Sequence, residues 1–187
     1  MFAEFGYGIL LVGFLVTVYS LVTAVYGVMD KSAAMVESSR RGMLLVFPLL
    51  SLSAAALIYL LINNHFEVSF VYEVTSRSMP TYLKVTAWWG GQAGSLVFWS
   101  WLLAVFTSAV TLRKGDRDAE FLPWVIVVSS VTLAFFLGMV VIFENPFTRF
   151  LVDNGNVTPS MFAPSATATI FDPADRQGMN PLMRHPG

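Results

Sequence analysis

Residues 85–112, VTAWWGGQAGSLVFWSWLLAVFTSAVTL, decide the fold class because the whole stretch is free of charged side chains. Crossing the hydrocarbon layer of a bilayer, about 30 Å thick, takes about 20 helical residues. Three more uncharged intervals reach that length, residues 5–29, 43–62 and 121–143. Since backbone polar groups in lipid must be bonded within the segment, long uncharged runs favour helices. The sequence predicts an all-α integral membrane protein with four transmembrane helices.

The composition supports this class and excludes several others. Hydrophobic residues make up 56% of the chain and charged residues only 12%, against about 25% charged residues in soluble domains. The absence of cysteine excludes disulfides, thiolate metal ligands and thiol nucleophiles. A net charge of -1 without a long basic cluster argues against a nucleic-acid partner. We identify no catalytic residue and no metal site.

Basic residues predict the orientation, because lysine and arginine in short connections stay on the cytoplasmic side. The connection between the first two spans and the one between the last two hold six of the eleven basic residues: Lys31, Arg40, Arg41, Arg113, Lys114 and Arg117. Both termini are then predicted to be extracytoplasmic. The first span starts with Glu4 and exceeds the 7 to 15 apolar residues of a signal peptide, so we expect the chain to retain it.

Two segments are predicted to lie outside the bilayer. Residues 65–74, HFEVSFVYEV, alternate with period two, which predicts a short extended segment. Residues 144–187 hold six of the nine prolines, and we expect this Pro-rich tail to lie across another surface without its own core. The predicted domains are a four-helix transmembrane module, residues 1–143, and this extracytoplasmic tail, which we expect to be truncated or to end one piece of a split protein.

Small residues at the start of the third span predict close helix packing. Gly90 and Gly94 form a G-x-x-x-G pair, and Gly91 with Ser95 repeats the spacing one position along. Without bulky side chains, another helix can approach this backbone closely. These four residues are predicted to form a helix-packing face.

The tryptophans of the same segment have two interpretations. Trp88 and Trp89 at the start of the span could anchor it at the level of the lipid headgroups. Gln92 and Trp99 lie seven residues apart on the predicted face of Trp88, so the stripe could instead be a platform with an amide donor for an aromatic macrocycle. The pattern by itself leaves both open.

The same residues carry a resemblance to a known family. Residues 89–96, WGGQAGSL, followed by Trp99, resemble the W-G-x-x-x-G-S-L-x-x-W signature of CcmF-type haem lyase subunits, which include CycK-like and NrfE-like proteins of bacterial cytochrome c maturation. Two later segments agree in order and spacing, NPF at Asn145, Pro146 and Phe147, and GMNPLM at residues 178–183, which contains Asn180 and Pro181. The resemblance covers nearly the whole chain but only the family's N-terminal part.

The resemblance implies a multi-pass protein of the bacterial inner membrane that takes part in haem delivery and covalent haem attachment to apocytochrome c. It implies haem b as the cofactor and, as partners, the remainder of the haem lyase, a haem chaperone, apocytochrome c, other maturation subunits and membrane lipid. The family's haem-ligand histidines lie outside this segment, and neither His65 nor His185 falls in a predicted span. Whether the chain is itself an enzyme therefore stays open.

The resemblance also assigns roles to the residues singled out above. A border of the haem cavity is expected at Trp88, Trp89, Gln92 and Trp99. A seat for a helix of the remaining haem lyase is expected at Gly90, Gly91, Gly94 and Ser95.

Two other classes of function are alternatives to a haem lyase module. A transport or proton-pump subunit normally places ionisable residues at membrane depth, whereas the four intervals contain none and only Lys84 stands at an edge. A purely structural packing protein would give the tryptophans and the tail motifs no chemical meaning. Both alternatives keep the four-helix topology.

Overall fold

Four long helices dominate the computed structural model, which describes residues 2–112, 121–153, 156–162 and 168–171. These helices are α1 (Phe2–Met29), α2 (Ala33–Ile62), α5 (Gln92–Leu112) and α6 (Leu122–Ile142). All four are long and apolar enough to cross a membrane. The predicted helices are confirmed in number and kind within the described part of the chain.

Two helix boundaries differ from the uncharged intervals. α2 begins at Ala33, well before residue 43, because ion pairs within one turn join Glu37 to Arg40 at 3.2 Å and to Arg41 at 3.0 Å. α5 begins only at Gln92, because residues 81–89 form two shorter helices of their own. Charged residues limit how much of a helix can lie in lipid, but they do not limit the length of the helix itself.

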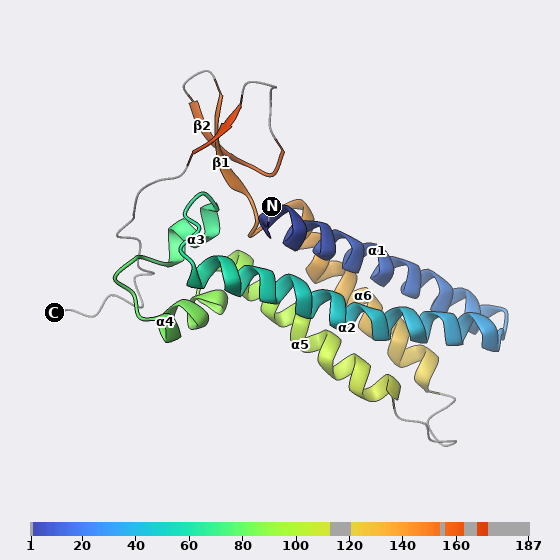
Figure 1. The fold of residues 1–187 in the computed structure, drawn as a ribbon. Helices are drawn as coiled ribbons and strands as arrows, with labels where there is room; N and C mark the ends of the chain where they lie inside the picture. The colour runs from blue at the N-terminus through green and yellow to red at the C-terminus, as the bar shows by residue number, and fades with distance from the viewer. Residues whose placement is uncertain (1, 113–120, 154–155, 163–167, 172–187) are drawn as a thin grey trace.

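Each long helix packs mainly against two others, so that the order around the bundle is α1, α2, α5 and α6 (Figure 1). The buried residues of α1 alternate in spacings of three and four: Ala3, Gly6, Leu10, Gly13, Thr17, Ser20, Ala24 and Gly27. Most are small, which lets backbones approach where lipid gives no hydrophobic drive between helices. At one such contact the Ser53 hydroxyl of α2 donates a hydrogen bond to the Gly6 carbonyl oxygen at 3.0 Å.

Short helices cover one end of the bundle: α3 (Ser69–Val74), α4 (Thr81–Thr86) and the 3₁₀-helix η1 (Ala87–Trp89). The predicted extended segment at residues 65–74 is therefore wrong over most of its length. Its buried residues are Phe70, Val71 and Val74, a helical spacing that the period-two alternation concealed. Packing of this face against the start of α5 decides the structure of so short a segment.

A three-stranded antiparallel sheet stands beside these short helices, with the order β2 (Asn156–Ser160), β1 (Arg149–Asp153) and β3 (Thr169–Ile170) (Figure 1). The prediction that the protein is all-α is wrong for this part of the chain. Short strands are stable only when they are paired, and the pairing partners of these strands come together only in the folded chain.

The beginning of β1 is joined to the segment before α3. The Ser69 N–H donates to the Thr148 carbonyl oxygen at 2.9 Å, and the Phe150 N–H donates to the Glu67 carbonyl oxygen at 2.8 Å. These bonds fix the sheet to the helical end of the molecule. The division of the chain at residue 143 stays a prediction.

Candidate functional site

The segment with the glycines and tryptophans turns sharply and does not form one continuous helix. Gly90 ends η1, Gly91 lies in a bend, and α5 then begins at Gln92. The predicted packing face on a single helix is therefore wrong for Gly90 and Gly91. The close backbone approach observed here is that of Gly94 to the Trp88 carbonyl oxygen, within this chain.

Gly91 and Gly94 face the ring of Phe70 on α3. A β-carbon on Gly91 would lie 2.7 Å from Phe70 Cε2 and 3.1 Å from Val74 Cγ1, closer than ordinary contact. A β-carbon on Gly94 would clash with the Phe70 ring and with the carbonyl oxygen of Trp88. Glycine is thus required at both positions by packing within this chain. A role in seating a helix from elsewhere stays a prediction.

Ser95 and Gln92 form the first turn of α5. The Ser95 hydroxyl donates to the Gln92 carbonyl oxygen at 2.9 Å, and the Ser95 N–H donates to the Gly91 carbonyl oxygen at 2.9 Å. The N–H bond is the first backbone bond of the helix, and the hydroxyl adds a side-chain bond within the same turn. The Gln92 side chain is exposed, so its amide is available to a partner.

An aromatic cluster lies next to this turn. Phe98 is at its centre, with ring centroids 5.2 to 6.4 Å from those of Trp88, Trp89, Trp99 and Trp101. Trp88 is only 6% exposed, whereas Trp89 and Trp99 are 46% and 57% exposed. Because Trp88 belongs to η1, the predicted stripe on one helix face is not formed. A haem-cavity border at these residues stays a prediction.

The NPF segment forms a turn that is held by its own side chains. Asn145 Oδ1 accepts a hydrogen bond from the Phe147 N–H at 2.9 Å, as in an Asx-turn. The Thr148 hydroxyl donates to the Asn145 carbonyl oxygen at 3.2 Å. The Phe147 ring is fully buried against Gly6, where a β-carbon would clash with it. Pro146, between them, is also buried. The segment therefore fixes the sheet to the start of α1.

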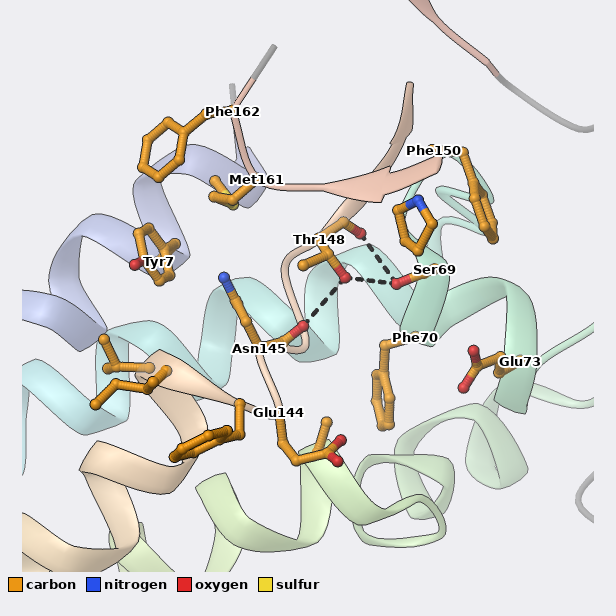
Figure 2. Close-up of a pocket in the computed structure, with 15 residues that line it drawn as sticks. Tyr7, Ser69, Phe70, Glu73, Glu144, Asn145, Thr148, Phe150, Met161 and Phe162 are labelled. Carbon is orange, nitrogen blue, oxygen red and sulfur yellow. Dashed lines mark hydrogen bonds between the residues drawn. The ribbon is translucent and has the colours of Figure 1, made fainter. Parts of the chain in front are cut away.

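One residue of the first motif segment and one of the NPF turn line the same cavity of about 490 Å³, shown in Figure 2. They are Ala93, in the first turn of α5, and Asn145, and Phe70 lines the cavity as well. Two of the three motifs recognised in the sequence are thus brought together by the fold. The third motif, with Asn180 and Pro181, lies outside the described residues.

Polar and aromatic groups share the wall of this cavity. The hydroxyls of Ser69 and Thr148 are 2.6 Å apart, and the carboxylates of Glu73 and Glu144 also line the cavity (Figure 2). No basic side chain is found among the described residues that line it. Aromatic walls with two carboxylates suit an apolar group that carries positive charge or hydrogen-bond donors. Tyr7 closes the side formed by α1.

His65 is engaged in a local contact outside the spanning helices. Its Nδ1 lies 2.8 Å from Glu67 Oε1, and its ring is 5.9 Å from that of Tyr59. His185 lies outside the described residues. In the described part of the chain no group of three metal-ligating side chains is found, and nothing there shows a haem site.

Sequence reasoning missed two residues that organise this end of the molecule. Phe70 lies in the segment predicted to be extended, whereas the spacing of residues 70, 71 and 74 indicates a helix. Lys84 stands at the edge of a predicted span, but it is 5% exposed and its Nζ donates to Asn64 Oδ1 at 2.6 Å. The backbone of Asn64 is left-handed, with φ 56°, which asparagine tolerates well.

Comparisons with known proteins identify the relatives of this chain, although no family model matches it. It is 30% identical over 165 residues to the cytochrome c-type biogenesis protein CcmF of Haemophilus influenzae, which covers 86% of this chain and 26% of that protein. It is 29% identical over 167 residues to the probable cytochrome c-type biogenesis protein NrfE of Escherichia coli, covering 89% and 27%. For CycK of Bradyrhizobium diazoefficiens the values are 26% over 149 residues, covering 80% and 23%.

A solved structure has the same fold. The cytochrome c haem lyase CcmF superposes with a TM-score of 0.72 at 17% identity, over 79% of this chain and 25% of that one. The chain thus spans about a quarter of the length of the relatives that it matches. On the combined sequence and fold agreement, this multi-pass chain is a homologue of the CcmF, NrfE and CycK cytochrome c-type biogenesis proteins, over about a quarter of their length.

Proposed function

We propose that the chain is the N-terminal membrane module of a CcmF-like haem lyase and takes part in haem delivery to apocytochrome c and in its covalent attachment. The observation that carries the proposal is the agreement of this chain, in sequence and in fold, with proteins named for cytochrome c biogenesis. The proposed partners are the rest of the haem lyase, a haem chaperone, apocytochrome c and other maturation subunits.

In this proposal the module provides a scaffold and a surface over which haem passes. Haem b needs axial ligands such as histidine, and the described residues do not fit that need, because His65 lies outside the spans and is bonded to Glu67. The axial ligands of haem are therefore proposed to lie in another part of the assembly. The exposed rings of Trp89 and Trp99 are the residues of this chain proposed to contact the macrocycle.

Two features argue for this function over a proton pump. The four long helices carry no ionisable residue in their central turns, and the buried ammonium of Lys84 lies on the short helix α4, outside them. The proposed location is the bacterial inner membrane, with the cavity end and both termini on the extracytoplasmic side. The packing-protein alternative predicts that the exposed tryptophans can be replaced without loss of function.

The test compares exposed aromatic residues of η1 and α5. Trp99→Ala and Trp89→Ala are introduced into the chain in its native host, with Phe106→Ala as the control because Phe106 is 64% exposed two turns beyond Trp99. Holocytochrome c is quantified by haem staining, and association with the other maturation subunits is measured by co-purification. We expect the tryptophan variants to lose most holocytochrome while co-purification persists. Equal holocytochrome levels in all three variants would refute the proposed haem surface.

A further inference from the structure

A second cavity lies at the other end of the bundle, where α1 ends, α2 begins and α6 begins. Its volume is about 550 Å³. Val28, Val36, Leu122 and Trp124 provide apolar wall, and Lys31 lines it from the connection between α1 and α2. Neither of the two motifs that lie in the described residues lines it, and the proposed haem lyase function makes no use of it.

The position of this groove corresponds to the boundary of a bilayer. α1, α2 and α6 are helices that can span a membrane, and the groove lies where all three have their ends. Trp124 is 58% exposed at the beginning of α6, a place where tryptophan prefers the headgroup region. An occupant of the groove would therefore have one part in the hydrocarbon and one part among headgroups.

Of the charged groups around the groove, the Lys31 ammonium has no bonded partner among the described residues. Glu37 is bonded to Arg40 at 3.2 Å and to Arg41 at 3.0 Å. Arg40 is further bound through Nε to the Thr111 carbonyl oxygen at 2.7 Å. Lys31 has no hydrogen bond or ion pair with any residue in the described ranges, and its neighbour Asp30 does not line the groove. Glu37 and Arg40 also line the groove but are bonded to each other, so the groove combines an apolar wall with this ion pair and with the Lys31 ammonium, which has no bonded partner among the described residues.

The backbone of Lys31 gives an independent reason to assign it a role. Its φ is 51°, in the left-handed region. Just after a helix this conformation is normally taken by glycine, and a residue with a β-carbon has about a 1 kcal/mol disadvantage there. Glycine would be preferred at this position on backbone grounds alone, so the lysine here motivates the hypothesis that its side chain has a role.

We propose that this groove binds an anionic phospholipid, with the lipid phosphate against the Lys31 ammonium and an acyl chain along Val36, Leu122 and Trp124. Both halves of the ligand match what the groove offers, and its depth matches the headgroup level. Lipid bound here would join α1, α2 and α6 at the end of the bundle opposite to α3, α4 and η1. The proposal is independent of any haem chemistry.

The test uses the full chain, purified in mild detergent, and titrates phosphatidylglycerol or phosphatidylcholine while bound lipid is measured by native mass spectrometry. We expect selective binding of phosphatidylglycerol and about fivefold weaker binding in Lys31→Gly, the effect of one basic residue near an anionic lipid. Lys31→Gly also relieves the left-handed strain, so its stability without lipid is not lowered. Arg41→Gln, which removes a paired cation outside the groove, is the matched control and keeps wild-type binding.

A second pair of variants tests the apolar wall. Ala33→Phe fills the groove, whereas Ala34→Phe adds the same ring at an exposed neighbour that does not line it. We expect only the first to lose phosphatidylglycerol binding. Equal binding of the two lipids, or wild-type binding by Lys31→Gly, overturns the proposal. Competition by glycerol 3-phosphate or inorganic phosphate at concentrations equal to those of the lipid would show an anion site without lipid recognition, and would overturn it as well.

Discussion

Gly94→Ala tests the tightest packing in the candidate site. The added methyl group would meet the Trp88 carbonyl oxygen and the Phe70 ring, whose Cε1 would be 3.0 Å away. A flexible side chain could adopt another rotamer, but the Trp88 carbonyl belongs to the backbone of η1, and Phe70 is a buried residue of α3. Either η1 or α3 must therefore move for alanine to fit.

The expected cost follows from two opposing terms. Overpacking a well-filled position costs about 1–3 kcal/mol, and the backbone contact places this case at the upper end of that range. Replacing glycine by alanine inside a helix returns about 0.5–1 kcal/mol. We expect Gly94→Ala to lower the free energy of unfolding by about 2 kcal/mol, the difference between the two terms.

The matched control is Gly138→Ala, because Gly138 also lies in a spanning helix. Its added methyl group would be 3.6 Å from Phe14 Cε2, an ordinary contact, so this variant is expected to keep or slightly gain stability. Equilibrium unfolding in mixed detergent micelles, followed by tryptophan fluorescence, reports on both variants, since Trp88 adjoins the strained position. If Gly94→Ala unfolds at the same denaturant concentration as Gly138→Ala, the close approach of η1 to α5 is not as described.

Three further substitutions test contacts elsewhere by the same unfolding measurement. Asn64→Gly keeps the left-handed backbone but removes the acceptor of Lys84 Nζ, so it should lower the free energy of unfolding by about 1–3 kcal/mol. Lys84→Met should change this free energy little, and a larger loss in Lys84→Met than in Asn64→Gly would contradict the explanation. Trp101→Phe loses the 3.0 Å bond from Nε1 to Ser51 Oγ and should cost about 0.6–1.7 kcal/mol, a cost that should largely vanish in the Ser51→Ala background, so that the double-mutant cycle shows coupling between the two residues. Phe147→Ala empties a fully buried position and should cost about 3–5 kcal/mol; a smaller loss than in Trp101→Phe would show that the NPF turn does not hold the sheet.

The family resemblance and the four spans were accessible from the sequence because both depend on short-range patterns. The motif from Trp89 to Trp99 and the NPF turn can be read without a fold, and the comparisons confirmed the relatives that they indicated. The role of the glycines was not accessible. Small residues at a spacing of four predict a helix face, whereas Gly91 is in a bend whose partner, Phe70, is distant along the chain.

Short elements were the least predictable part of the protein. Residues 65–74 have a pattern that suits a strand as well as a helix, and Phe70 and Val74 form a helical face only because the start of α5 offers them two glycines. The strand β1 likewise depends on partners on both sides, β2 and β3, and on the backbone of Glu67. Such segments have too few contacts of their own to fix their structure.

By itself the sequence determined that this chain is a set of four lipid-compatible helices, because a charged residue in hydrocarbon is costly and a peptide group there must be bonded locally. These are properties of consecutive residues, so no knowledge of neighbours is needed. Only the tertiary structure decided where the helices begin, what covers their end, which motifs share a cavity and which lysine is free. Those features depend on contacts between residues far apart in the sequence, and such contacts exist only once the chain has folded.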